Sequence, residues 1–195
     1  MAITNTKNQH GLYHMTYDDV LIAGFGGQGV LLAGKLLAWA GMLDGLHVTW
    51  FPSYGAEMRG GTANCTVVMS KEEIGSPVVD SPHVLVAFNQ ASVDKFMARV
   101  KRGGLVILNS SLVIKEPSRA GVRVIRVPAN DIAAELGDVR VANMVMLGAY
   151  IKATGNVGMV SVARALEQAL PARRKGLAAM NMTALKRGGS EAGND

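Results

Sequence analysis

The sequence of 195 residues contains one cysteine, Cys65, and few aromatic residues, which make up 5% of the chain. One cysteine excludes an internal disulfide framework and an iron–sulfur cluster held by cysteines of this chain alone. Because Cys65 falls within the strand-like run 63–69, we expect it to be a small buried hydrophobic residue. The His, Asp and Glu residues do not cluster with the spacing of metal ligands, so no metal site is predicted.

Long apolar runs and a strong excess of one charge are also missing. No run is long enough to span a membrane, and the polar segment Met1–His10 lacks the apolar core of a signal peptide. We therefore expect a cytoplasmic protein without a membrane partner. The net charge is +5, of which +3 lies from Pro171 onward, and aromatic residues are not interleaved with basic ones. This pattern argues against nucleic-acid binding and favours a solvated basic segment or a contact with an acidic partner.

Apolar runs alternate with helical patterns along the chain, which predicts an α/β fold. We expect strands at 18–23, 47–51, 63–69, 83–88, 105–108 and 122–127, and a short return strand at 74–79. Helices are expected at 29–43, 91–100, about 130–137, 142–153, 159–170 and 173–186, with Asn89 as an N-cap.

The order of these elements predicts a three-layer α/β/α fold with a mostly parallel, mixed Rossmann-like sheet. The tight turn 70–73 would make the return strand antiparallel to the strand before it, hence a mixed sheet. We expect residues 1–16 to be a flexible N-terminus, residues 17–187 to form a single α/β domain, and residues 188–195 to form a flexible tail.

A glycine-rich turn directly follows the first strand. Residues 24–29 read Gly-Phe-Gly-Gly-Gln-Gly, and the spacing of Gly24, Gly26 and Gly29 is typical of turns that cradle a phosphate at a helix N-terminus. With Gly27 and Gln28, these residues form the first half of a candidate cofactor-binding site. An alternative is that the glycines serve only tight packing between strand and helix.

A nicotinamide dinucleotide is poorly supported by this turn. Such sites need an acidic residue at the end of the second strand, where it binds the ribose. Asp44 has about the right spacing, but it precedes the second strand, and that strand ends in Trp-Phe-Pro-Ser without an acidic residue.

A second specialised loop follows the second strand and supplies the other half of the candidate site. Its residues are Ser53, Tyr54, Gly55, Glu57, Arg59, Gly60 and Gly61. Arg59 could bind a carboxylate or phosphate in bidentate fashion, or it could form a structural ion pair with Glu57. In a parallel sheet both loops leave the same carboxyl edge, where ligands of such folds bind.

No set of catalytic residues emerges from the sequence. The histidines His10, His14, His47 and His83 are scattered, and the last two fall at strand starts, opposite the expected ligand edge. The methionines, including Met144, Met146, Met180 and Met182, have helical spacing and are expected to fill a core or an interface. We therefore predict no catalytic residue in this chain.

Together these motifs resemble one known family. The turn 24–29, the motif Pro-Ser-Tyr-Gly-Ala-Glu-Met-Arg-Gly-Gly at 52–61, Ser76-Pro77, Asn89-Gln90, Gly103-Gly104 with Asn109-Ser110-Ser111, and Asn143-Met144 with Leu147-Gly148 are similar to the gamma subunit of 2-oxoacid:ferredoxin oxidoreductases. The likeness spans about residues 18–170. The serine-containing form of the second motif is closer to the 2-oxoglutarate and branched-chain 2-oxoacid members than to the pyruvate members.

The resemblance implies a part in the oxidative decarboxylation of a 2-oxoacid, with acyl transfer to coenzyme A and reduction of ferredoxin. It implies that thiamine diphosphate, magnesium and iron–sulfur clusters belong to companion alpha, beta and ferredoxin-like delta subunits. This chain would bind none of them alone, would lie near the coenzyme A site, and could dimerise in isolation through its exposed interface. Two alternatives are a free-standing nucleotide-binding protein and a purely structural module.

Overall fold

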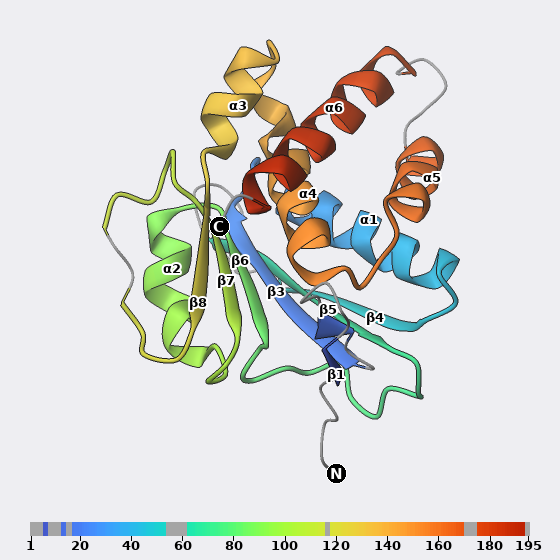
Figure 1. Ribbon diagram of the computed structural model, residues 1–195, viewed down its shortest axis with the longest axis vertical. Coiled ribbons are helices and arrows are strands. Elements are labelled where there is room, and N and C mark those ends of the chain that lie inside the picture. Colours follow the sequence, from blue (N-terminus) through green and yellow to red (C-terminus); the bar gives the residue numbers. More distant parts are fainter. Residues whose placement is uncertain are drawn as a thin grey trace.

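The computed structural model describes residues 6–7, 13–14, 17–53, 62–115, 118–169 and 175–193 (Figure 1). Its strands are β1 (Thr6–Lys7), β2 (Tyr13–His14), β3 (Tyr17–Phe25), β4 (His47–Ser53), β5 (Thr62–Ser70), β6 (Val84–Ala87), β7 (Leu105–Asn109) and β8 (Arg123–Val127). Its helices are α1 (Val30–Leu43), α2 (Gln90–Phe96), α3 (Ala129–Glu135), α4 (Ala142–Thr154), α5 (Met159–Ala169) and α6 (Lys175–Ala192), with short 3₁₀ turns η1 (Met97–Arg99) and η2 (Val139–Val141).

Six strands form one mixed sheet in the order β4-β5-β3-β6-β7-β8. The strands β3, β6, β7 and β8 are parallel, whereas β5 lies between β3 and β4 and is antiparallel to both. The mixed, mostly parallel sheet that the sequence predicts is thus confirmed.

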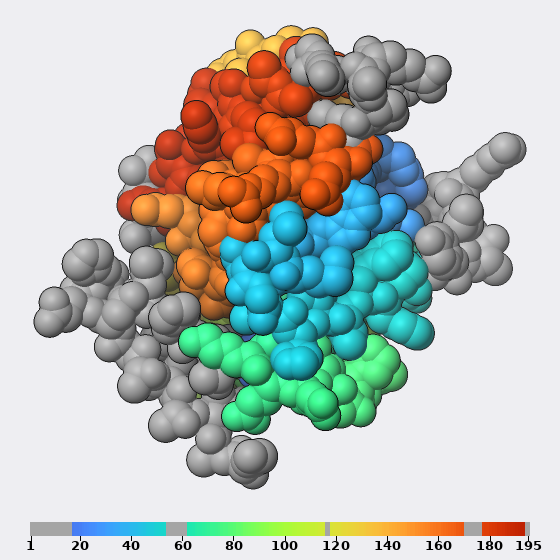
Figure 2. All heavy atoms as spheres, turned by 90° about the vertical axis from the view of Figure 1, so that its right-hand side faces the viewer, coloured from blue at the N-terminus to red at the C-terminus, as the bar shows by residue number. Residues whose placement is uncertain are grey.

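Helices cover both faces of the sheet, which confirms the three-layer fold. In β3, Val20 and Ile22 join the core under α1, α4, α5 and α6, while Leu21 and Ala23 join the smaller core under α2. Figure 1 shows α2 alone on its side, and Figure 2 shows α6, α5, α1 and the edge strand β4 following one another down the other side. Because β3 is buried on both faces, its sequence is a continuous apolar run rather than an alternating one.

The short return strand predicted at 74–79 is wrong. The structure has turns and bends at 71–83 and no strand there. The physical reason is that β5 already pairs with β3 on one side and β4 on the other, so no free edge remains for a third strand. Near the N-terminus, β1 and β2 pair with each other.

The C-terminal helix continues beyond its predicted end. We expected the helix to end at Lys186, but α6 continues to Ala192. Gly188 lies where α6 crosses α4, and a Cβ atom there would overlap the backbone carbonyl of Val145. Gly148 of α4 faces the carbonyl of Leu185 in the same way. The glycines that weaken a helix in isolation are therefore the residues that let the two backbones approach closely.

The interior of this helical layer is α4. Every residue from Ala142 to Ile151 is buried, including Met144 and Met146, which confirms the expected core role of these methionines. Met180 and Met182 of α6 are partly buried against the same core. Within the described residues, none of the helices has the length and apolarity needed to cross a membrane.

Candidate functional site

The two sequence motifs leave the sheet at the same edge, as predicted. Phe25 at the end of β3 lies opposite Thr62 of β5, and Ser53 at the end of β4 lies opposite Asn64. The carboxyl ends of β6, β7 and β8 reach this edge too, toward α3 in Figure 1. The rest of the second motif, with Tyr54, Gly55, Glu57, Arg59, Gly60 and Gly61, lies outside the described residues.

The glycine turn is held together by the side chain of Gln28. Its Oε1 atom accepts hydrogen bonds from the backbone N–H of Phe25 at 2.7 Å and from Nδ2 of Asn89 at 2.9 Å. Gly27 and Gly29 have φ angles of 95° and 74°, in the left-handed region that favours glycine. The Gln28 side chain, between Gly27 and Gly29, therefore fixes the turn and ties it to the end of β6.

Two glycines of the turn have a packing role, as one alternative proposed. A Cβ atom at Gly24 would lie 2.7 Å from the Gln28 and Val30 side chains, and one at Gly29 would overlap the Asn143 amide. Gly27 differs, because no atom lies within 4 Å of a Cβ placed there. Close packing thus explains why glycine occupies positions 24 and 29. The backbone at Gly27 is instead open at the carboxyl edge of the sheet.

A set of asparagines braces the edge from the neighbouring strands. Asn89 caps α2 by accepting from the Ser92 N–H at 2.9 Å, as the sequence predicts. Asn109, at the end of β7, donates to Phe88 O at 3.2 Å and to Oδ1 of Asn130 at 2.8 Å. Asn143 donates to Gly29 O at 3.3 Å. We did not predict site roles for these asparagines, although the positions of Asn89 and Asn109 at the ends of buried strands were a usable signal.

A cleft of about 200 Å³ opens between the glycine turn and the segment that leads into α4. It is lined by Gly27, Gln28, Phe88, Asn130, Val139, Arg140 and Ala142. Arg140 is exposed and forms hydrogen bonds of 2.6 to 3.0 Å to the Asp138 carboxylate, which lower the pKa of Asp138 to about 2. Arg140 therefore brings guanidinium N–H donors to the glycine turn, with its charge balanced by the Asp138 carboxylate, and the sequence did not predict this residue.

A second cleft of about 560 Å³ lies on the other side of Gln28, against α2. Its lining includes Phe25, Asn89, Gln90 and Leu112. The Gln90 side chain accepts from the backbone N–H groups of Ile114 at 3.1 Å and Lys115 at 2.9 Å, and so it anchors the loop after β7. The turn thus stands between two clefts, one against α2 and one that contains Arg140.

Among the described residues, a cluster of titratable side chains lies at the edge of the sheet opposite the glycine turn. His83 bonds to Asp19 through its ring at 3.0 Å, and Lys101 reaches the same carboxylate at 3.2 Å. Burial alone would raise the pKa of Asp19, but the hydrogen bonds from His83 and the charges of His83 and Lys101 together lower it. Next to it, burial raises the pKa of Asp18, whose carboxylate accepts hydrogen bonds from Tyr150 and Asn156. These contacts join β3 to its neighbours and lie far from the glycine turn.

Among the described residues, neither Cys65 nor His47 offers a reactive group to the ligand edge. Cys65 is fully buried, and burial raises the pKa of its thiol to about 12. His47 is exposed at the start of β4. In the described ranges no group of three or more His, Cys, Asp or Glu side chains could hold a metal ion. The open backbone at Gly27 and the guanidinium of Arg140 place N–H donors for an anionic ligand at this edge of the sheet.

A mixed α/β sheet with a glycine turn at its carboxyl edge is the architecture of Rossmann-like domains. The family model described as pyruvate ferredoxin/flavodoxin oxidoreductase matches residues 19–191. The chain belongs to this family, and the resemblance to its gamma subunits is confirmed by named relatives and solved structures.

Two relatives show how much of each chain the sequence similarity covers. The 2-oxoglutarate synthase subunit KorC of Methanothermobacter marburgensis is 41% identical over 160 residues, which cover 78% of this chain and 86% of KorC. The ketoisovalerate oxidoreductase subunit VorA of the same organism is 49% identical over 140 residues, 72% of this chain. Those residues span only 29% of VorA, so the chain corresponds to a part of that longer protein.

Two solved structures share the fold. The gamma subunit of a keto/oxoacid ferredoxin oxidoreductase from Geobacter sulfurreducens has a TM-score of 0.80 and 29% identity, and the match covers 91% of this chain and 99% of that one. The 2-oxoglutarate:ferredoxin oxidoreductase from Magnetococcus marinus, solved with 2-oxoglutarate, coenzyme A and succinyl-CoA bound, has a TM-score of 0.84 and 27% identity. That match covers 91% of this chain and 31% of the other.

Proposed function

We propose that this chain is the gamma subunit of a cytoplasmic, multisubunit 2-oxoacid:ferredoxin oxidoreductase. The complex decarboxylates 2-oxoglutarate or a branched-chain 2-oxoacid oxidatively, forms the acyl-CoA and reduces ferredoxin. Companion alpha and beta subunits, with a ferredoxin-like delta subunit, hold thiamine diphosphate, magnesium and the iron–sulfur clusters. The single, buried cysteine of this chain and its lack of a described metal-ligand group are consistent with that division.

We further propose that the carboxyl edge of the gamma subunit lines the coenzyme A region. The observation that carries this proposal is that Gly27 and Arg140 line one cleft. Coenzyme A carries anionic phosphate groups, and an open glycine backbone beside a guanidinium provides N–H donors for them. The second motif, which includes Ser53 and Arg59, leaves the same edge and would contribute to the same region.

The decisive variant is Arg140→Ala in the assembled complex. A hydrogen bond to a charged group contributes about 1.5–3 kcal/mol, so the KM for coenzyme A should rise by about 10-fold or more. The matched control is Arg187→Ala, because Arg187 is also an exposed arginine paired with a carboxylate, at 2.7 Å from Glu135, and lies outside the cleft lining. An unchanged KM for coenzyme A in Arg140→Ala, or an equal rise in both variants, would contradict this role of the cleft.

The wider proposal is tested by an anaerobic pull-down of the tagged chain. We expect larger subunits to co-purify and the eluate to reduce a viologen dye only with a 2-oxoacid and coenzyme A. Comparison of 2-oxoglutarate, a branched-chain 2-oxoacid and pyruvate would then identify the substrate. A chain that elutes alone and binds a dinucleotide would instead support the free-standing nucleotide-binding alternative.

A further inference from the structure

The positive charge of the protein is concentrated in one segment. Residues 95–126 contain eight cations and one acidic residue, a net charge of +7, and the rest of the chain therefore carries a net charge of −2. This segment runs from α2 through η1 and β7 to β8. The basic C-terminal stretch is thus not the main source of the net charge of +5.

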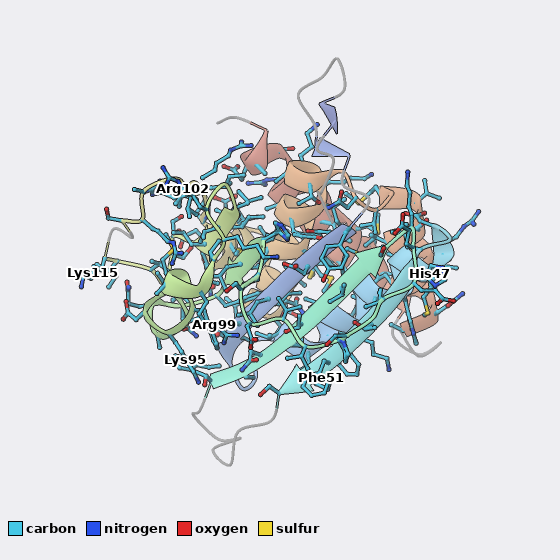
Figure 3. All side chains as sticks on the ribbon, turned by 90° about the horizontal axis from the view of Figure 1, so that it is seen from below. His47, Phe51, Lys95, Arg99, Arg102 and Lys115 are labelled. Carbon is cyan, nitrogen blue, oxygen red and sulfur yellow. The ribbon has the colours of Figure 1, made fainter. Side chains whose placement is uncertain are left out.

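Five of these cations surround α2, on the sheet face opposite the other helices. We call this surface the basic face, and its residues are Lys95, Arg99, Arg102, Lys115 and Arg119. Figure 3 shows the four labelled members around α2 and its flanking turns, with His47 and Phe51 across the sheet on β4. Among the described residues, no carboxylate forms an ion pair with Lys95, Arg99 or Arg102. Asp94 of α2 is the acidic side chain of this helix.

Neutral groups hold Lys95, Arg99 and Arg119 in place without cancelling their charge. Arg99 donates to the carbonyl oxygens of Asp80 at 2.7 Å and Val79 at 3.1 Å, and Arg119 donates to that of Met97 at 3.0 Å. Lys95 and Arg99 also lie 5.3 and 5.6 Å from the centre of the Phe96 ring. The basic face is therefore a preorganised positive surface.

The chemistry of the basic face favours an acidic protein over a nucleic acid. Its aromatic residue, Phe96, is only 3% exposed and offers no platform on which a base could stack. The cations are spread over α2, the turn after it and the loop after β7, which suits an extended carboxylate-rich surface. A charged face of this kind is typical of reversible, electrostatically steered encounters, whereas the cores of permanent interfaces are depleted in charge.

We propose that the basic face is a docking surface for an acidic protein that binds reversibly. This inference rests on the proposed function, in which the acceptor protein of the complex is the partner that must arrive and leave in each cycle. The probe is accordingly the acidic ferredoxin of the same host, and docking requires no cofactor within this chain.

The test compares two charge-matched double variants in the assembled complex. Lys95→Glu/Arg102→Glu reverses two cations of the basic face. Lys152→Glu/Arg164→Glu reverses two exposed cations on α4 and α5, which cover the other face. Steady-state rates are measured with ferredoxin and with methyl viologen, each at low and high salt, and gel filtration checks the assembly of each complex.

The basic-face variant should lower kcat/KM for ferredoxin by about 10-fold or more at low salt, since electrostatic steering accelerates association by about 10–1,000-fold. The difference should shrink at about 1 M salt, where the screening length is about 3 Å. Viologen reduction should stay unchanged in both double variants, and the control should keep its ferredoxin rate. The neutral variant Lys95→Gln/Arg102→Gln should give an intermediate loss.

Three outcomes would overturn the inference while leaving the proposed function intact. The basic-face variant could retain its ferredoxin kinetics, or both double variants could lose them equally. Alternatively, the basic-face variant could release the companion subunits in gel filtration, which would make a subunit of the complex the occupant. A wild-type complex without 2-oxoacid-dependent viologen reduction would instead refute the proposed function itself.

Discussion

The crossing of α4 and α6 allows a prediction in which two adjacent glycines respond to the same substitution with opposite signs. A Cβ atom at Gly188 would overlap the carbonyl oxygen of Val145, a backbone atom that cannot rotate away. At Gly189 the nearest atom to a new Cβ is the carbonyl oxygen of Gly148 at 3.5 Å, an ordinary contact. Both residues lie inside the helix Lys175–Ala192, so the helix-propensity term is the same for both.

The expected changes in the free energy of unfolding follow from helix propensity and from steric overlap. Replacement of glycine by alanine within a helix gains about 0.8–1 kcal/mol. Overpacking a well-filled contact costs about 1–3 kcal/mol, and more when backbone must move. Gly189→Ala should therefore stabilise the protein by up to about 1 kcal/mol, and Gly188→Ala should destabilise it by about 1–2 kcal/mol. At about 2–4 °C per kcal/mol for a chain of this size, the two variants should differ in Tm by roughly 4–12 °C.

Thermal and urea unfolding of the purified chain, followed by far-UV circular dichroism, measures this difference. Gly148→Ala serves as a second test of the crossing, because its Cβ would overlap the Leu185 carbonyl and should also destabilise. Equal stabilities of the Gly188→Ala and Gly189→Ala variants would refute the close backbone approach of α4 and α6. Stabilisation by Gly188→Ala would show that the end of α6 does not pack where the structure places it.

Three further predictions concern buried groups and the turn. Cys65, buried and with its thiol pKa raised to about 12, should resist iodoacetamide in the folded protein and react only after unfolding, as mass spectrometry would show. Burial raises the pKa of Asp18, so its stabilising contribution is complete below its unfolded-state pKa and is lost as the pH rises through the folded-state pKa. Asp18→Asn should therefore lose less stability than wild type between about pH 4 and 7 in urea titrations, and an identical pH profile would contradict the raised pKa. Gln28→Ala removes the acceptor of two hydrogen bonds and should cost about 1–3 kcal/mol, whereas the exposed Gln168→Ala should have almost no effect on the same unfolding curves.

The sequence by itself determined the elements that local pattern encodes. The run 18–23, the glycine turn 24–29 and the cap Asn89 were each predicted correctly, since strand burial, left-handed backbone and capping depend on nearby residues. The shared edge of the two motifs also followed, because β3 and β4 run in the same direction. The net charge of +7 on residues 95–126 could also have been counted from the sequence, but the net charge of the whole chain, +5, does not reveal it.

Only the tertiary structure decided which distant segments meet. The position of β5 between β3 and β4 removed the predicted return strand, because strand pairing depends on contacts that no local pattern records. The close approach of α4 explains why α6 extends past Gly188, where propensity alone predicted an end. Arg140 joins the cleft at Gly27 from more than a hundred residues away because the chain folds back over the sheet edge. Local patterns determined the elements, and long-range packing assembled the cleft from them.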